Sequence, residues 1–524
     1  MNQRLHLLKK PIFATQLLLF ITFAPRYALA QLVYPDAVAY RTGFFDNYYT
    51  NPDSAILYAR KLSSDPKYAS FLRQAVHDDI FFMFSNEVKQ KFREQGLKVK
   101  DPDWKSKYDE FLKPIYSTLY KMSTDANVIL ANSARPIYLW VNLHKMQQNI
   151  DDATELKKLD VSGNGNAPKD KAQIDLNTLS SPADISKMKQ LVQALINSQR
   201  EQKDHYQDKN NTYALLMYQD IANNKSFQKQ ADELLSTTMD ATFSALQNID
   251  ISTASDTILQ KRAWNRYLYA TANYFKAKAL AKSGDQKAAA TYFNKAAEYS
   301  PDLVDQRNHG SYGPEVTLFA HRQDELFQLA HVDYLKKYGN KEQVLSAITQ
   351  MAVRNPIDHK AELNTYYTAN FALEEPFSSY WKKAINKGLP KAPDVHIQKL
   401  DGSSYSSAGK AGKWILVDFW GSWCGPCRAE HPALQQLCLR SSQLPSSNLD
   451  IITVACQDTK DKVVSYMNEF KYTFPVAMND RRLDKAYNVH GFPTKALITP
   501  EGNYLQIPFN STDWIKFIER YVED

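Results

Sequence analysis

Two residues separate the pair of cysteines that is best suited to chemistry in this sequence. Cys424 and Cys427 belong to the run WCGPC, and the other two cysteines of the 524-residue chain are Cys438 and Cys456. All four thiols lie in the last quarter of the chain, which favours a domain that exchanges disulfides over a scaffold held together by them. We expect Cys438 and Cys456 to be free, buried thiols.

The residues before this pair predict a buried strand, and those after it predict a helix. KWILVDFW, residues 413–420, is a nearly continuous apolar run, typical of a strand covered on both faces. The helix should begin near Cys424, because Pro426 is tolerated in a first turn. Free backbone amides and the positive end of the helix dipole would favour a Cys424 thiolate, so Cys424 is the predicted nucleophile. Cys427, one turn deeper, is the predicted resolving thiol.

Two carboxylates are candidates to accept the proton of the resolving thiol. Asp418 lies inside the apolar strand, where burial would raise its pKa toward the working pH. Glu430 and His431 follow Cys427 by three and four residues, so helical spacing turns both toward the same side. We assign a functional role to both acids, with the choice between them open, and expect His431 to lie on the surface.

Longer stretches around the cysteines resemble a known family. ILVDFWGSWCGPCRAEHPAL, residues 415–434, is similar to the active-site segment of the thioredoxin superfamily. KAPDVHIQKLDG at 391–402, Glu430, and VHGFPTKALITPEGNYL at 489–505 narrow the resemblance to the exported TlpA/ResA-type thiol:disulfide oxidoreductases. The resemblance covers about 135 residues at the C-terminal end.

This resemblance implies a fold, a site and an activity. The fold would be the α/β thioredoxin-like fold, with Cys424 attacking, Cys427 resolving and Pro493 as a cis-proline that aligns the substrate backbone. The implied substrate-binding residues are Trp423, Gly425, Pro426, Phe492 and Thr494. The Gly-Pro pair between the cysteines favours reduction of substrates. Disulfide-containing exported proteins would be the substrates, and the electrons would come from a membrane-linked donor.

Other chemistries fit the sequence less well. A zinc site at the cysteine pair would have no second ligand pair, and covalent haem would need histidine where Arg428 stands. A peroxiredoxin-like peroxidase would need a Pro-x-x-x-Thr-x-x-Cys context, which the sequence does not have. We therefore expect no metal and no bound cofactor, with the Cys424–Cys427 disulfide as the redox centre.

The first thirty residues have the layout of a secretory signal. A basic start is followed by an apolar stretch at 12–24 and by a small-residue triplet that ends at Ala30. We expect cleavage after Ala30 and export, to the periplasm. A permanent anchor is the weaker alternative, because this apolar stretch is shorter than the roughly 20 residues that span a bilayer.

The charge balance argues against a polyanionic partner. The net charge is +7, and four of the basic residues lie in the predicted signal, which leaves about +3 on the mature chain. We therefore expect no nucleic-acid partner.

Glycine content divides the remaining chain. Residues 31–385 contain 8 glycines and the much shorter stretch 386–524 contains another 8, which predicts a change from helices to strands and turns. A linker is expected around residues 383–393. GDQKAAATYFNKAAEYSP, residues 284–301, resembles the tetratricopeptide repeat, and residues 339–356 are a weaker copy. A generic helical bundle is the alternative.

The sequence therefore predicts a multi-domain chain, with an all-α helical-repeat N-terminal region and a C-terminal α/β thioredoxin-like fold. The predicted parts are a signal peptide at 1–30, a helical region of unknown role at 31–210, tetratricopeptide-like helices at 211–385 and the thioredoxin-like domain at 386–524. The repeats would offer a surface to a protein partner. In the alternative function, the chain is an envelope protein-binding scaffold whose helices are the working part and whose thioredoxin domain is accessory.

Overall fold

The computed structural model describes most of the chain after the predicted signal. The described residues are 34–84, 104–161, 182–201, 204–251, 253–410, 412–443, 448–508 and 513–523. The signal peptide predicted at 1–30 lies outside them. Among the described residues, no helix combines the length and the apolarity that crossing a bilayer requires.

The chain divides into two compact units, Met1–Ser244 and Ala245–Asp524. The first unit ends later than the boundary predicted at residue 210. The second unit contains residues 245–385 of the region predicted as tetratricopeptide-like helices, together with the region predicted as the thioredoxin-like domain. Residues 211–244 of the predicted repeat region belong to the first unit. The domain boundaries predicted from the sequence stay predictions.

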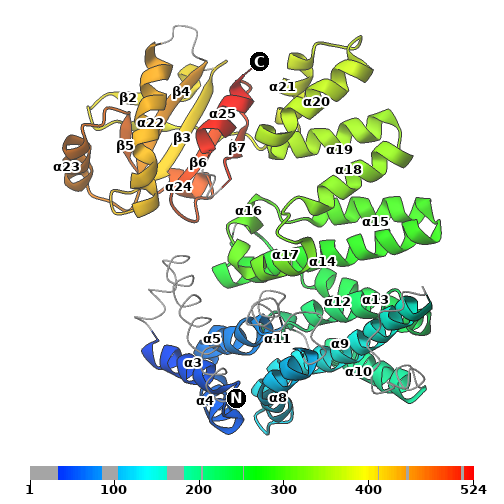
Figure 1. Ribbon diagram of the computed structural model, residues 1–524. Helices are drawn as coiled ribbons and strands as arrows, with labels where there is room; N and C mark the ends of the chain where they lie inside the picture. Colours follow the sequence, from blue (N-terminus) through cyan, green and yellow to red (C-terminus); the bar gives the residue numbers. More distant parts are fainter. Residues whose placement is uncertain are drawn as a thin grey trace. The chain divides into compact units, whose positions relative to one another are not determined.

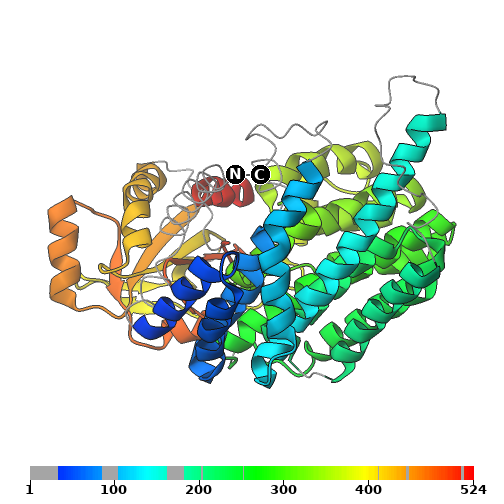
Figure 2. The ribbon, with the colours of Figure 1, turned by 60° about the horizontal axis from the view of Figure 1, so that its bottom comes forward.

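The first unit is built from helices, as the sequence predicts. Its longer helices are α3 (Pro35–Asn47), α4 (Pro52–Ser63), α8 (Trp104–Ser123), α9 (Val128–Val161), α10 (Pro182–Glu201), α12 (Asn210–Ile221) and α13 (Gln228–Ser244). Neighbours in sequence pack in pairs, and α8 lies beside α9 in both views of the chain (Figures 1 and 2). Buried aromatic rings such as Phe44 and Tyr48 stack within its core.

The second unit begins with another run of helices. They are α14 (Asp256–Ser283), α15 (Gln286–Tyr299), α16 (Leu303–Gln306), α17 (Gly313–Ala320), α18 (Leu326–Tyr338), α19 (Lys341–Arg354), α20 (Pro356–Phe371) and α21 (Phe377–Asn386). The two repeat-like segments form α15 and α19, which pack against α14 and α18 respectively. The all-α prediction for this region is confirmed, and the repeat assignment stays a prediction.

The turn between α14 and α15 follows from its residues. Gly284 ends α14 with φ +94°, a left-handed conformation that glycine adopts without steric cost. The Asp285 side chain then accepts a hydrogen bond from the Ala288 amide and caps α15. Ala289 and Phe293 lie on the buried face of α15. The small side chain of Ala289 lets α14 and α15 approach closely.

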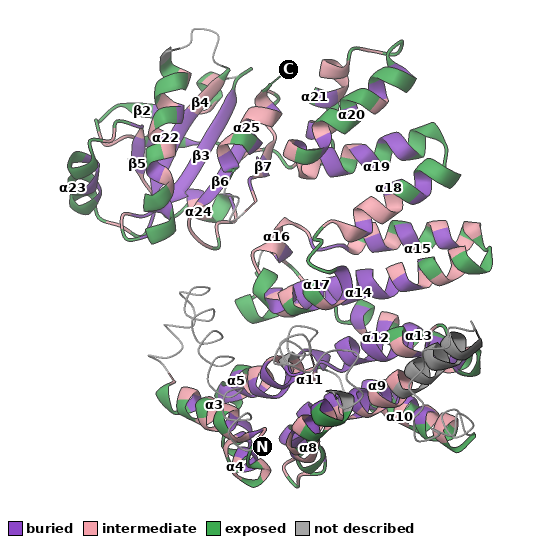
Figure 3. Cartoon of the chain, viewed as in Figure 1, coloured by how far each residue is buried: buried purple, intermediate pink, exposed green. Residues whose placement is uncertain are grey.

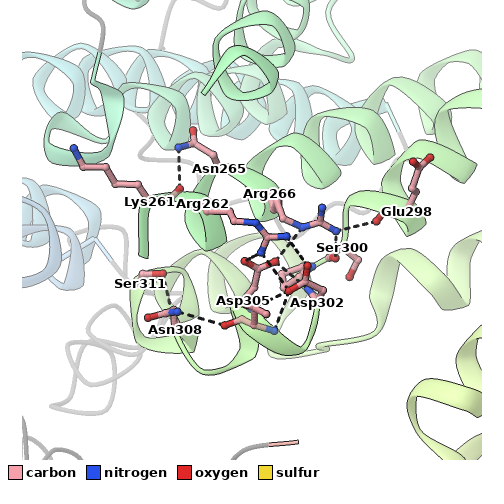
Figure 4. A network of polar contacts seen from close by, with 12 residues as sticks. Lys261, Arg262, Asn265, Arg266, Glu298, Ser300, Asp302, Asp305, Asn308 and Ser311 are labelled. Carbon is pink, nitrogen blue, oxygen red and sulfur yellow. Dashed lines mark hydrogen bonds and ion pairs between the residues drawn. The ribbon is translucent and has the colours of Figure 1, made fainter. Parts of the chain in front are cut away.

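A buried ionic network ties the short helix α16 to α14 (Figure 4). Arg262 donates to both Asp302 and Asp305, and Arg266 pairs with Asp305 at 3.0 Å. Arg266 also donates to the carbonyl of Ser300. Because the Asp305 carboxylate is fully buried, removing both arginines would leave a costly unpaired charge.

The C-terminal part is an α/β domain built around one central sheet. A five-stranded sheet has the order β5 (Val476–Met478), β4 (Leu449–Ala455), β3 (Trp414–Trp420), β6 (Thr494–Ile498), β7 (Tyr504–Gln506). The sheet is joined by the hairpin β1 (His396–Gln398) and β2 (Ser404–Ser406), and by the helices α22 (Gly425–Gln443), α23 (Lys460–Phe470), α24 (Leu483–Ala486) and α25 (Trp514–Val522).

The central strand β3 is buried along its whole length, as its apolar run predicts (Figure 3). It pairs in parallel with β4 and antiparallel with β6. Residues alternate between two apolar clusters on opposite faces of the sheet, so that Leu416 packs on one face and Val417 on the other. The face that carries Leu416 is covered by α22 and α25 (Figure 1).

The same apolar cluster continues from the sheet into helices α18–α21. Trp381 of α21 stacks on Tyr521 of α25 with ring centroids 6.0 Å apart. Tyr521 donates its hydroxyl to the carbonyl of Val353 at the end of α19. Ile385 is also buried in this cluster, and residues 383–386 are the last residues of α21. The linker expected at 383–393 is thus corrected for its first residues, because the apolar face of α21 needs cover.

Replacing Trp381 by alanine tests this shared core. The Trp381→Ala variant should lower the free energy of unfolding by about 3 to 5 kcal/mol, because a large ring leaves a cavity between α21 and α25. Urea unfolding measures the change. The matched control is Trp423→Ala, since Trp423 is 54% exposed and its loss should cost much less. Equal losses in the two variants would contradict the shared core.

Candidate active site

The two cysteines of WCGPC form a disulfide at the start of α22. Their Cα atoms are 5.3 Å apart, and the amide of Cys427 donates to the Cys424 sulfur at 3.2 Å. The helix begins at Gly425, and Pro426 stands in its first turn as predicted. Both sulfur-bearing residues are buried, while Gly425 and Pro426 are exposed. The disulfide therefore lies just beneath the surface at the positive end of a helix dipole.

An aromatic pair borders the disulfide. The ring of Trp423 meets Phe492 edge-on, with centroids 5.6 Å apart. The Trp423 indole N–H donates to the carbonyl of Gln457 at 3.1 Å. A Cβ atom on Gly421 would lie 2.5 Å from that indole nitrogen, so glycine is what lets the ring lie across the strand end. The exposed Trp423 ring gives the site an apolar rim.

The loop before β6 carries the predicted cis-proline. The Phe492–Pro493 peptide bond is cis. Thr494 is buried, and its hydroxyl donates to the carbonyl of Gly491 at 2.7 Å. The Thr494 side chain therefore braces this loop, whereas Phe492 is partly exposed toward Trp423.

Asp418 and Glu430 are brought together by a residue that the sequence interpretation missed. Lys495 of β6 stands opposite Asp418 of β3 in the antiparallel register. Its ammonium nitrogen lies 3.3 Å from an Asp418 carboxylate oxygen and also donates to Glu430. The same nitrogen lies 4.6 Å from the centroid of the Trp514 ring. A single lysine inside the apolar run of β6 was the available signal, because a charge there needs a partner.

Burial and the Lys495 charge have opposite effects on the pKa values of the two acids. Burial raises the pKa of Asp418, and the neighbouring Lys495 ammonium only partly offsets this rise. The pKa of Glu430 is also raised by burial, against the lowering effect of Lys495. The pKa values of both carboxyl groups are therefore raised, which is the direction that suits a carboxylate that accepts a proton near neutral pH.

The expectation that His431 lies on the surface is wrong. His431 is 1% exposed, and its Nδ1 lies 2.8 Å from the Tyr466 hydroxyl. The ring also stands edge-on to Trp420, with centroids 4.5 Å apart. Four residues after Cys427 is one helical turn, and this turn faces the aromatic cluster between α22 and α23. Burial first, and then the charges of Lys495 and Arg428, lower the pKa of His431 to about 4.

The two remaining cysteines are free thiols, as predicted. Cys456 is buried as predicted, whereas the prediction of burial is wrong for Cys438, which is only half-buried on α22. Burial raises the pKa of both thiols to about 12. Neither side chain forms the thiolate near neutral pH, so neither competes with Cys424 and Cys427 in thiol exchange.

The described residues offer no group of three or more His, Cys, Asp or Glu side chains placed to hold a metal ion. The expectation of no metal and no bound cofactor stays a prediction. The chemistry that these residues support is exchange between the Cys424–Cys427 disulfide and other thiols.

A central sheet, a strand-to-helix dithiol and an opposing cis-proline loop define a thioredoxin-like protein. Comparison with known proteins agrees, since a profile described as the AhpC/TSA family matches residues 390–504. The thiol-disulfide oxidoreductase ResA of Bacillus subtilis (strain 168) is 30% identical over 144 residues, 27% of this chain and 74% of that protein. ResA of Geobacillus kaustophilus (strain HTA426) is 31% identical over 160 residues, 30% of this chain and 84% of that protein.

Through this C-terminal part the chain belongs to the ResA-like thiol-disulfide oxidoreductases. It is a thiol-disulfide oxidoreductase. Among solved structures, a thiol:disulfide interchange protein of the thioredoxin family from Chlorobium tepidum TLS is 26% identical, with a TM-score of 0.23. The match covers 26% of this chain and 97% of that chain.

The environment of His431 predicts a pH-dependent stability. An unfolded histidine titrates near pH 6.5 and folded His431 at about 4, so its contribution is complete above 6.5 and is lost as the pH falls toward 4. Between pH 7 and pH 5 this loss should be about 2 kcal/mol. Urea unfolding at the two pH values measures it.

The His431→Gln variant should remove this part of the pH dependence. The matched control is His396→Gln, which changes an exposed histidine of the same domain. An unaltered difference between pH 7 and pH 5 in His431→Gln would show that His431 does not titrate as its burial requires.

Proposed function

We propose that this protein is an exported disulfide reductase that acts on other exported proteins through the Cys424–Cys427 dithiol. The observation that carries the proposal is the cysteine pair at the start of α22, beside the exposed Trp423 and the Phe492–Pro493 loop. The ResA-like sequence supports the general chemistry. The Gly-Pro pair between the cysteines supports the reducing direction.

The reduction takes place in two exchanges. The Cys424 thiolate attacks one sulfur of a substrate disulfide, which breaks that bond, forms a mixed disulfide and releases one substrate thiolate. The Cys427 thiol then loses its proton, and its thiolate attacks the Cys424 sulfur. The Cys424–Cys427 disulfide forms as the second substrate thiolate leaves. The two substrate thiolates take up two protons, so the substrate gains two electrons and two protons.

The surroundings of each sulfur fit these roles. Cys424 stands at the helix end, where unpaired amides and the helix dipole favour the thiolate. Asp418 and Glu430 are the proton acceptors for Cys427, because burial raises the pKa of both. Restoring the dithiol needs two electrons and two protons, which we assign to a membrane-linked thiol donor.

The proposed substrate surface surrounds the buried disulfide. Trp423, Gly425 and Pro426 are exposed, and Phe492 is partly exposed beside them. We propose that an extended substrate segment lies across these residues along the Pro493 loop, and that Thr494 acts by bracing the loop. The helices α14–α21 would then hold the substrate or its carrier protein.

Replacing Cys424 by serine tests the nucleophile. With insulin as the disulfide substrate and dithiothreitol as the electron source, Cys424→Ser should reduce insulin no faster than dithiothreitol alone. Turbidity from the released insulin chain measures the rate. Cys438→Ser is the matched control and should retain activity, because that thiol is half-buried with a pKa of about 12. Activity retained by Cys424→Ser would refute the assignment.

Replacing Cys427 by serine should trap the substrate. A mixed disulfide on Cys424 has no internal thiol to resolve it, so exported proteins should stay attached and be released by reductant. Non-reducing electrophoresis with mass spectrometry identifies them. The same experiment with Cys424→Ser, Cys427→Ser should yield no adducts. Equal adducts in both variants would show that capture does not depend on Cys424.

The scaffold alternative has its own test. If the helices alone do the work, a cell that lacks this protein should recover fully when it receives the Cys424→Ser variant. The reductase proposal predicts no recovery with that variant and full recovery with Cys438→Ser.

A further inference from the structure

Two carboxylates in the domain core share one ammonium group. Lys495 contacts Asp418 at 3.3 Å and donates to Glu430. Its side chain is 5% exposed, and that of Asp418 is 3% exposed, whereas 26% of the Glu430 side chain reaches solvent. The Asp418 end of the cluster is therefore shielded from solvent, whereas the Glu430 end is in contact with it.

Three elements fix this arrangement. The antiparallel register sets Lys495 of β6 opposite Asp418 of β3, and α22 brings Glu430 from above the sheet. The Trp514 ring of α25 covers the ammonium from a further side, 4.6 Å away. Because the aromatic face attracts a cation, this contact helps to hold the ammonium group in place between the two carboxylates. Glu430 is also one helical turn after Cys427.

We propose that Lys495 is a positioning residue that joins Asp418 and Glu430 into one proton-accepting unit for Cys427, with Glu430 as its exit to solvent. This inference rests on the proposed reductase function and names the part of the site that the second exchange needs. One lysine and two carboxylates carry a net charge of −1. Taking up the Cys427 proton brings the unit to zero charge, which suits a buried site.

The proton balance of the step is simple. The Cys427 thiol gives its proton to the unit, and the resulting thiolate attacks the Cys424 sulfur. The Cys424–Cys427 bond forms, and the second substrate thiolate leaves. The unit then returns its proton to water through Glu430. No electrons pass through Lys495, which acts only by holding the two acids and setting their charge.

The other titratable groups around the unit do not supply this proton path. His431 of α22 has a pKa of about 4 and is neutral near pH 7, with its Nδ1 beside Tyr466. Cys438 of α22 and Cys456, the residue after β4, have pKa values raised by burial and by the charge of Asp418, and both remain protonated thiols. The charge of Arg428 of α22 lowers the pKa of His431, and its guanidinium lies over the Tyr466 ring.

The test separates the two exchanges in time. The reduced full-length protein is mixed with 5,5′-dithiobis(2-nitrobenzoate), an aromatic disulfide that releases one coloured thiolate at each exchange. Stopped-flow absorbance should show a first release from attack by Cys424 and a second from attack by Cys427. The Cys424→Ser protein gives the background from Cys427, Cys438 and Cys456, and Cys427→Ser should show the first release alone.

The expected result concerns the pH dependence of the second release. Without the ammonium, the two acids repel each other and hold a proton to higher pH. The rate of the second release falls at low pH, and this falling part of the profile is its acid limb. In Lys495→Met the acid limb should therefore move to higher pH by about 1 to 3 units. Lys495→Arg keeps the charge and should keep the limb within about half a unit. Lys399→Met, which removes a surface-paired lysine of the same domain, is the matched control and should leave the limb in place.

Two results would overturn the inference. One is a second release in Lys495→Met whose acid limb coincides with that of the native protein. The other is an equal shift in Lys495→Arg and Lys495→Met, because shape and not charge would then be responsible. If Lys495→Met does not fold, Glu430→Gln provides the decision: with the exit removed, the second release should slow at least tenfold at pH 7, and an unchanged rate overturns the inference. Loss of the first release in Cys424→Ser tests the proposed function separately.

Discussion

A charged group in the middle of a fully buried strand is the constraint on which the rest of the domain depends. Asp418 has apolar neighbours on both sides along β3, so its carboxylate must find a partner inside the protein. The partner is Lys495, and it reaches Asp418 only if β6 pairs with β3 in one register. A slip of a single residue would turn Lys495 to the opposite face of the sheet. The ion pair therefore specifies the pairing on which the Pro493 loop depends.

The same constraint links the sheet to α22, the helix that carries the disulfide. Lys495 also donates to Glu430, so α22 is held over the sheet by a charge as well as by its apolar face. The disulfide sits at the start of that helix, one turn before Glu430. Strand register, helix placement and the position of the thiols are thus parts of one arrangement. A buried pair of this kind is costly to break, since a lost partner leaves an uncompensated charge.

The thioredoxin-like domain is packed against the helices that precede it. Trp381 and Ile385 of α21 share an apolar cluster with Tyr521 of α25. The two ResA relatives match 27% and 30% of this chain, so most of the helical region lies outside those matches. Because of this shared core, the domain packs in one position against α18–α21. If these helices select the substrate, they do so with the Cys424–Cys427 site in a fixed orientation relative to them.

Much of the domain was predictable because its signals are local. The apolar run at 413–420 predicted β3, Pro426 predicted the first turn of α22, and the spacing of Cys424 and Cys427 predicted the redox pair. The roles of Asp418 and His431 depended on which side of an element meets which neighbour. Helical spacing alone put His431 near Cys427, but only packing against Tyr466 and Trp420 made it a core residue.

The sequence by itself determined the chemistry of this protein: two thiols at a strand-to-helix junction, two acids nearby and helices before them. Those properties follow from residue type and short spacing, which act within a few turns of chain. Only the tertiary structure decided that Lys495, 77 positions after Asp418 and 65 after Glu430, joins the two acids. It also decided that α21 shares the core of the domain. The reason is physical: the partner of a buried charge or an apolar face is chosen by distance in space, which the chain order does not contain.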